Sequence, residues 1–167
     1  MYDKPLIVVA LESEYKNPEV DILYTGVGKV NALVSLANNI EKFGPPSLIV
    51  NYGTAGTVNK KHKGLVEVDV ILQRDMIAEP QAPRGITPFD KDEVAGAMML
   101  NSNTDVTLGT GDSFVQEPDP WFEYASVDIV DMEAYALAKF AKIKNIPFRC
   151  FKYCLLYTSP SPRDRYG

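Results

Sequence analysis

Residues 20–44 read VDILYTGVGKVNALVSLANNIEKFG, in which a short strand, a glycine turn and a helix follow one another. The apolar run Val20–Tyr24 is typical of a strand, and it ends at the turn Thr25-Gly26-Val27-Gly28. After the turn, apolar residues recur with helical spacing and predict one buried helix face, formed by Val30, Leu33, Val34, Ala37 and Ile40. Gly44-Pro45-Pro46 is expected to end the helix. This strand–turn–helix unit indicates an α/β fold.

The same alternation of strand-like and helix-like segments continues along the chain. Further strands are predicted at Lys4–Leu11, Ser47–Val50, Val66–Leu72, Val106–Leu108, Val127–Val130 and Phe148–Tyr153. A second helix is predicted over Met132–Lys144, with an inward face formed by Met132, Tyr135, Ala136, Phe140 and Ile143. Residues 77–93 are rich in proline and are expected to form a long loop that serves as a lid or a pocket wall. The pattern predicts a largely parallel or mixed sheet covered by helices, with ligands at the carboxyl ends of its strands.

The composition excludes several classes of protein. A chain of 167 residues fits one domain, and 17 basic against 22 acidic residues argue against nucleic acid as a partner. The longest apolar run, Leu6–Leu11, is far shorter than the ~20 residues that span a bilayer, and the N-terminus lacks the pattern of a secretory signal. Two cysteines near the end and a single histidine, His62, exclude a disulfide framework and a histidine-rich metal site. We therefore expect a soluble, cytoplasmic domain.

The turn Gly26-Val27-Gly28 is the first candidate ligand site. Backbone N–H groups at a helix N-terminus favour anions or polar ligand atoms. Asn31 occupies the third glycine position of a dinucleotide motif, and Val30 replaces the Ser/Thr of a P-loop, so neither motif is complete. A tight turn that lets helix and strand pack closely remains the alternative.

Acidic residues follow two of the predicted strands. Glu12 and Glu14 come after the first strand, where a carboxylate suits the role of general base for water, although a solvated strand end has the same pattern. Asp131 and Glu133 bracket Met132 where a buried strand meets a helix, a costly position for carboxylates that are neither paired nor used. Asp131 is also explained as an N-terminal helix charge, whereas Glu133, one turn into the helix, suits hydrogen bonds to sugar hydroxyls.

The segment Gly109–Val115 supplies an aromatic ring beside flexible backbone. Its glycines allow the backbone to approach another group closely, and Phe114 is suited to stack on a flat ring. A hairpin or bulge with Phe114 in the core is the alternative.

Taken together, five segments resemble the successive motifs of the nucleoside phosphorylase superfamily. They are Ala10–Glu14, Thr25–Ala32, Asn51–Gly56, Gly111–Val115 and Val130–Ala134, and the resemblance covers roughly residues 4–153. The sequence is most similar to the hydrolytic branch, the 5′-methylthioadenosine/S-adenosylhomocysteine nucleosidases and related short nucleosidases. This resemblance implies a three-layer α/β/α domain with a mixed central sheet. It also implies hydrolysis of a purine nucleoside with release of adenine, no metal or cofactor, and a homodimer.

The resemblance also implies a role for individual residues. Glu14 falls where the family places the carboxylate that activates the attacking water, and Glu133 where a carboxylate grips the ribose hydroxyls. The other implied substrate-binding positions are Gly28, Thr54 in the glycine loop near the sugar, Phe114 stacked on the purine, Val115 reading the base edge through its main chain, and Met132 at the ribose.

Asn51 bears on the choice between water and phosphate as nucleophile. It occupies the place where many phosphorylases carry a phosphate-binding arginine, and a neutral amide cannot supply that charge or bidentate geometry. Water is therefore favoured. The alternatives are a phosphate-dependent phosphorylase, a noncatalytic nucleotide-binding domain built on Gly26-Val27-Gly28, and a fragment without function.

The end of the sequence departs from the family pattern. The family carries a Ser-Asp pair shortly after the last strand, and its aspartic acid protonates the leaving base, but here Leu155-Leu156 stands in that place. Asp164 lies among proline and arginine residues, which give no reason to place it in a pocket. We expect residues 1–153 to form a domain incomplete at its C-terminus and residues 154–167 to be a non-native tail. Without the usual aspartic acid, this chain is expected to turn over poorly.

Overall fold

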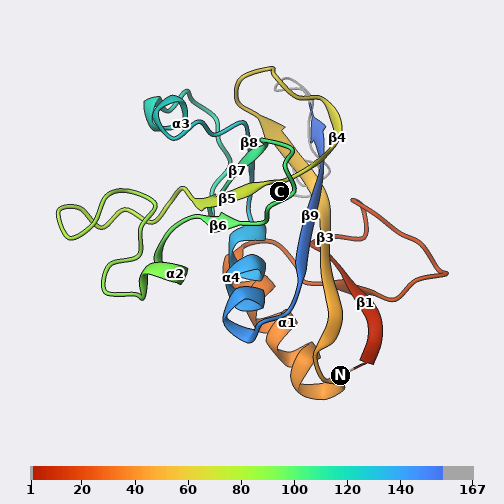
Figure 1. Cartoon of the computed structure of the whole chain (residues 1–167). Helices are drawn as coiled ribbons and strands as arrows, with labels where there is room; N and C mark the ends of the chain where they lie inside the picture. The colour runs from red at the N-terminus through yellow and green to blue at the C-terminus, as the bar shows by residue number, and fades with distance from the viewer. Residues whose placement is uncertain (1, 156–167) are drawn as a thin grey trace.

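The longest strand, β3 (Pro46–Thr57), organises the sheet in the computed structural model, which describes residues 2–155 (Figure 1). The other elements of this part, in chain order, are β1 (Tyr2–Val9), β2 (Ile22–Tyr24), α1 (Lys29–Phe43), β4 (Gly64–Glu67), β5 (Val70–Gln73), α2 (Asp92–Ala95), β6 (Met98–Met99), β7 (Thr107–Thr110), α3 (Pro120–Tyr124), β8 (Ile129–Asp131), α4 (Ala134–Lys144) and β9 (Phe148–Leu155). None of the helices in residues 2–155 combines the length and the apolar character needed to cross a bilayer.

The sheet mixes parallel and antiparallel pairs. Its strand order is β2-β1-β3-β8-β7-β5-β6, while β9 pairs with β3 and carries β4 on its other side. β1 and β9 run parallel to β3, whereas β8 runs antiparallel to it and parallel to β7. The predicted α/β fold with a mixed sheet is confirmed.

One edge of β3 changes partner part-way along the strand. β1 pairs with β3 as far as Asn51, and β8 pairs with it only at Gly56 and Thr57. Both partners lie on the same edge, because β9 pairs along the opposite edge from Ile49 to Gly56. Residues 52–55 therefore face an interval between β1 and β8, and the carboxyl ends of these two strands point toward it. We call this interval the β3 gap.

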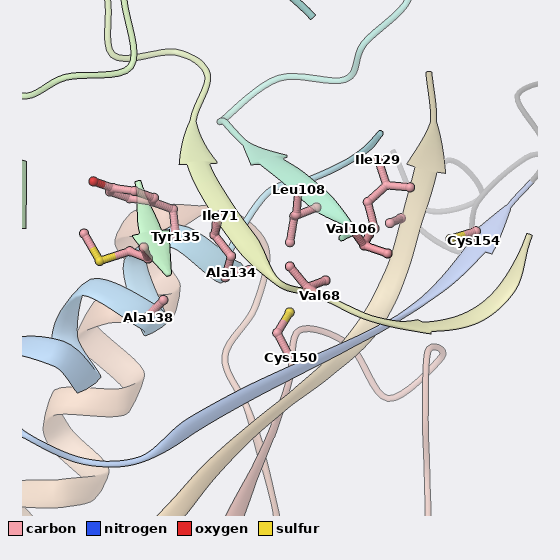
Figure 2. Packing of buried hydrophobic residues seen from close by; sticks show 12 residues of the cluster. Val68, Ile71, Val106, Leu108, Ile129, Ala134, Tyr135, Ala138, Cys150 and Cys154 are labelled. Atoms are coloured by element: carbon pink, nitrogen blue, oxygen red, sulfur yellow. The ribbon is translucent and has the colours of Figure 1, made fainter. Parts of the chain in front are cut away.

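Two apolar clusters surround the sheet. In the first, α1 and α4 lie side by side against β1 and β3 (Figure 1); it contains Leu6, Val8, Ala32, Leu36, Ile49, Leu137, Ala141 and Ile146. In the second, Ala134, Tyr135 and Ala138 of α4 lie beside Ile71, and Val68, Leu108 and Cys150 complete the centre (Figure 2). Because α4 belongs to both clusters, it fixes the residues that precede it, which include Asp131 and Glu133.

The predicted inward faces of the two helices are partly wrong. In α1, Val30, Leu33 and Val34 are 71%, 43% and 53% exposed, and Ala32 and Leu36 are buried instead. The sequence is apolar on both sides of this helix, so spacing alone could not identify the side that packs on the sheet. In α4, Tyr135 is buried and Ala136 and Phe140 pack against the first cluster as predicted, but Ile143 is exposed. The other buried residues of this helix, which were not predicted, are Ala134, Leu137, Ala138 and Ala141.

Several strand boundaries also differ from the prediction. Thr54 lies within β3 and not in a glycine loop, because β9 pairs with every residue of this stretch. The predicted strand Val66–Leu72 is two strands, since β4 pairs with β9 and β5 pairs with β7. β9 continues two residues beyond Tyr153, and Cys154 is buried. The non-native origin of residues 154–167 stays a prediction, and 156–167 lie outside the described residues.

Candidate active site

Glu14 occupies the β3 gap from the turn that follows β1. Its Oε2 atom accepts hydrogen bonds from the Thr54 N–H at 2.9 Å and the Thr54 hydroxyl at 2.8 Å. Its Oε1 atom accepts one from the Leu11 N–H at 3.2 Å, so both carboxylate oxygens are oriented by the protein. Glu12, the other candidate carboxylate after this strand, is exposed, because β1 ends at Val9 and the alternation of a strand stops there.

Gly53 lets Glu14 approach a lysine of the neighbouring strand. In the β3–β9 register, Gly53 lies opposite Lys152. A Cβ atom at Gly53 would stand 3.2 Å from Glu14 Oε2 and 3.3 Å from Lys152 Nζ. Glycine therefore leaves space beside the strand for both the Glu14 carboxylate and the Lys152 ammonium group.

Lys152 forms a buried ion pair with Asp131. Nζ of Lys152 lies 3.0 Å from Oδ2 of Asp131, and the two side chains are 1% and 0% exposed. Burial alone would lower the pKa of Lys152, but the Asp131 carboxylate raises it above its ordinary value, and Glu133 and Glu14 act in the same direction. Burial would raise the pKa of Asp131, but Lys152 and hydrogen bonds lower it overall. Both groups are therefore charged at neutral pH.

Asp131 and Glu133 connect this ion pair to two helices. Asp131 Oδ2 accepts a hydrogen bond from the Ala134 N–H at 2.9 Å, and Oδ1 accepts one from the Thr110 hydroxyl. The buried Glu133 accepts one from the Gly28 N–H at 2.8 Å, at the start of α1. The two predicted acids are thus both buried and both paired. Glu133 precedes the helix rather than lying one turn inside it, because α4 begins at Ala134, whose N–H donates to Asp131.

Phe114 and Val115 line a cleft of about 410 Å³, whose lining includes Arg74 but none of Glu14, Asp131, Glu133 or Lys152. Ile77 and Arg84 from the 77–93 segment also line it, which confirms the prediction that this loop walls a pocket. The Phe114 ring is not part of the core, since the residue is 49% exposed. An aromatic surface is therefore accessible at the cleft.

Arg74 fixes the backbone that leads to Phe114. Its guanidinium donates to the carbonyl oxygens of Gly109 at 3.1 Å, Gly111 at 3.1 Å and Ser113 at 2.6 Å. It also donates to the Ser113 hydroxyl at 3.0 Å and to the Asp131 carbonyl at 3.2 Å. Burial lowers the pKa of Arg74, although neighbouring Asp131 opposes this effect. This one side chain joins the cleft to the strand that ends at the ion pair.

Comparison with known proteins now identifies the family. The family model described as Phosphorylase superfamily matches residues 8–154. The chain belongs to the phosphorylase superfamily.

Relatives within this superfamily include 5′-methylthioadenosine/S-adenosylhomocysteine nucleosidases. The one from Bacillus pumilus is 27% identical over 157 residues, covering 80% of this chain and 66% of the relative. One from Bacillus cereus is 31% identical over 154 residues, covering 78% and 64%. The chain thus spans just under two thirds of the length of these relatives.

Solved structures show the same fold. The Helicobacter pylori MTAN-D198N mutant with 5′-methylthioadenosine has a TM-score of 0.77 at 18% identity, over 94% of this chain and 87% of that one. Futalosine hydrolase from Helicobacter pylori also has a TM-score of 0.77, at 17% identity over 93% and 85%. At such identities the likeness concerns the phosphorylase superfamily fold.

The structure brings together four of the residues predicted as a site for this superfamily member. Glu14 and Thr54 meet in the β3 gap, and Glu133 contacts Gly28 nearby. Met132, also predicted, is half-buried between Asp131 and Glu133, while Phe114 and Val115 lie along the adjoining cleft. Among the residues that the structure describes, no three His, Cys, Asp or Glu side chains are grouped so as to hold a metal ion.

Lys152 and Arg74 are the two members of the site that the sequence analysis missed. Alternation along β9 places Lys152 on the same face as the buried Cys150 and Cys154, and a lysine on such a face requires an acidic partner. This signal was present in the sequence. Arg74 directly follows the short apolar strand β5. Its guanidinium donates to backbone carbonyls, and no sequence pattern reveals such partners.

Proposed function

We propose that this chain binds a purine nucleoside of the 5′-methylthioadenosine or S-adenosylhomocysteine type and hydrolyses its N-glycosidic bond, releasing adenine. One observation carries the proposal: Glu14 and Glu133, which come from opposite parts of the chain, both lie near the buried Lys152. A cleft lined by an exposed aromatic ring is joined to this cluster through Arg74, which lines the cleft and donates to the Asp131 carbonyl. Paired carboxylates next to a stacking surface suit the cleavage of a bond between a sugar and a flat base.

Glu14 is suited to activate water. Its carboxylate is oriented through Thr54 and Leu11, so a water molecule at its surface would be held in a fixed direction. In the proposed step, Glu14 takes a proton as the water oxygen bonds to the anomeric carbon of the sugar. The bond from that carbon to the base nitrogen breaks, and its electron pair leaves with the base.

Glu133 is suited to bind the ribose. A carboxylate accepts about four hydrogen bonds, so Glu133 can engage hydroxyl groups while it holds the Gly28 N–H. Three carboxylates, on Glu14, Asp131 and Glu133, act on Lys152, and Arg74 is the second cation, beside Asp131. The site therefore carries excess negative charge where positive charge develops on the sugar, and this stabilises the transition state.

Asn51 supports water rather than phosphate as the nucleophile. Its side-chain amide donates to the Val8 carbonyl at 3.0 Å, and its oxygen accepts from the Cys150 thiol at 3.5 Å. Asn51 thus links β1 to β9 inside the sheet. A residue used in this way supplies neither the charge nor the geometry that binds phosphate.

We also propose that two copies of the chain associate through α1. Val30, Leu33 and Val34 form an exposed apolar stripe with the i, i+3, i+4 spacing at which helices pack together. The helix begins next to Gly28, so this interface would adjoin the site.

The proposal is tested by incubating the purified chain with 5′-methylthioadenosine, with and without phosphate. Binding is measured by calorimetry and adenine by chromatography. We expect binding, slow adenine release and no effect of phosphate, because Leu155-Leu156 supplies no carboxyl group to protonate the base. A chain that binds no nucleoside would refute the proposal, and phosphate-dependent release would favour a phosphorylase.

A gain-of-function variant sharpens this test. Leu156→Asp combined with Leu155→Ser restores the Ser-Asp pair, and acid catalysis is worth about 10²–10⁴-fold, so adenine release should rise within that range. The matched control is Leu156→Asn with Leu155→Ser, which has the same size but no acid and should stay slow. Adding Glu14→Gln to the restored chain should abolish the gain. Fast release by the unmodified chain would contradict the role of the missing acid.

A further inference from the structure

A ring of polar contacts joins three segments at the start of α1, and one of its members, Asp75, also lines the cleft. Lys29 Nζ lies 2.8 Å from Asp75 Oδ1, and Asp75 Oδ2 accepts a hydrogen bond from the Asp112 N–H at 2.9 Å. Asp112 Oδ1 in turn accepts one from the Lys29 N–H at 2.8 Å. The ring therefore ties α1 to the segment after β5 and to the segment after β7.

Two consecutive backbone N–H groups donate to carboxylates at the start of α1, and one of them belongs to the ring. The Lys29 N–H donates to Asp112, and the preceding Gly28 N–H donates to Glu133. Gly28 has φ of +98°, and a Cβ there would stand 3.3 Å from Asp112 Oδ1. Only glycine fits this conformation and this approach without strain. The start of α1 is thus held from two sides by carboxylates of different elements.

These two carboxylates belong to different halves of the proposed site. Asp112 is two residues before Phe114, the ring that would stack on the base, whereas Glu133 would bind the ribose. Besides Arg74, the adjacent N–H groups of Gly28 and Lys29 therefore help to set the relative position of the two halves, and Asp75 closes the ring from the third segment. Burial would raise the pKa of Asp75, but hydrogen bonds from the Lys29 side chain and the Asp112 N–H, together with the charge of Lys29, lower it overall, so that carboxylate stays ionised.

We propose that Asp75, with Lys29 and Asp112, is a positioning cluster that keeps the base-binding and ribose-binding halves in register, so that a nucleoside binds as one unit. The proposal rests on the proposed function. It differs from simple stabilisation by an ion pair, which would affect all ligands equally through the folded fraction. A register effect acts on a ligand that spans both halves and spares one that occupies a single half.

The test compares 5′-methylthioadenosine with adenine in binding to the chain and to Asp75→Asn, by calorimetry. We expect the Kd of the nucleoside to rise about tenfold and that of adenine to change less than about twofold, because small misalignments cost most for a ligand held at two points. Asp90→Asn removes the acid of the Lys139–Asp90 pair, which is similarly exposed and outside the ring, and should change neither value. Thermal unfolding of each variant checks the fold.

Lys29→Met gives an independent measurement if Asp75→Asn does not fold. It removes the Nζ contact and keeps the backbone N–H bond to Asp112, so the same ratio should shift in the same direction by a few-fold. Equal changes for both ligands, or no change, would overturn the positioning role while leaving the proposed function intact. A parent chain that binds neither ligand would overturn both.

Discussion

Replacing Lys152 by methionine is the most informative single perturbation of this structure. The side chain would keep its length and apolar stem but lose the ammonium group that lies 3.0 Å from Asp131. Asp131 would remain buried, held by Thr110 and Ala134 but without its counter-charge. Glu133 and Glu14 would add like charges nearby.

The expected cost is large. Breaking a buried ion pair by removing one partner costs about 3–5 kcal/mol, because an uncompensated charge stays in the interior. A domain has about 5–15 kcal/mol of stability in total, so Lys152→Met should lose a large part of it. Adding Asp131→Asn removes the stranded charge, and the double variant should be more stable than the single one.

The pH dependence gives a second, independent signature. In the parent chain, the lowered pKa of Asp131 contributes stability above its ordinary value of 3.8, and this is lost as pH falls through the folded-state pKa. The raised pKa of Lys152 contributes below its ordinary value of 10.5, and this is lost as pH rises through the folded-state pKa. Between these two pH limits, the ion pair does not make the free energy of unfolding depend on pH.

In Lys152→Met, burial dominates and raises the pKa of Asp131 above its ordinary value. The folded state then binds more protons than the unfolded state, so stability falls as pH rises above about 4. Urea unfolding, followed by circular dichroism and by the fluorescence of the single tryptophan, Trp121, measures this at pH 4.5 and pH 8. A loss below about 1 kcal/mol at pH 8, or a loss of equal size at both pH values, would refute the reasoning.

Three further outcomes are expected. Arg74→Met should cost about 3 kcal/mol in urea unfolding and weaken nucleoside binding, because the buried carbonyls after β7 lose their donor; unchanged stability would contradict this. Gly53→Ala should weaken nucleoside binding about tenfold by displacing Glu14 or Lys152, whereas Gly56→Ala, whose Cβ meets only Val130 at 3.5 Å, should not; equal effects would argue against the β3 gap as the site. Leu33→Glu should convert a dimer to a monomer in sedimentation, while Leu65→Glu, at a more exposed leucine on β4, should leave it intact; a monomeric parent chain would dismiss the α1 interface.

The sequence was sufficient for the fold class because strands and helices differ in period. Every predicted strand has a counterpart, and both long helices lie where the spacing of apolar residues puts them. The sequence could not predict which side of α1 packs against the rest of the domain, because Val30 and Leu33 are as apolar as Leu36. Burial there is decided by α4, which no local pattern in α1 reveals.

Glycines misled the prediction at Asn51–Gly56 for a related reason. Glycines favour turns locally, but this stretch is held as a strand by β9 along its whole length. The function of Gly53 is steric: it leaves room for two side chains that come from other elements. A sequence motif shows only that a glycine is present. The register with β9 is needed to know which side chains occupy the space beside Gly53.

The same register explains why the site is one unit. Glu14 reaches the β3 gap because β1 stops pairing with β3 at Asn51. Asp131 reaches the gap because β8 runs antiparallel to β3, so that its carboxyl end points back toward the gap. Lys152 reaches it because it lies opposite Gly53. Moving any of these strands by one residue would turn its side chain to the other face of the sheet, since the side-chain period is two. The charged cluster therefore depends on strand pairing, and substitutions that alter the pairing of β3 should impair the site before they unfold the domain.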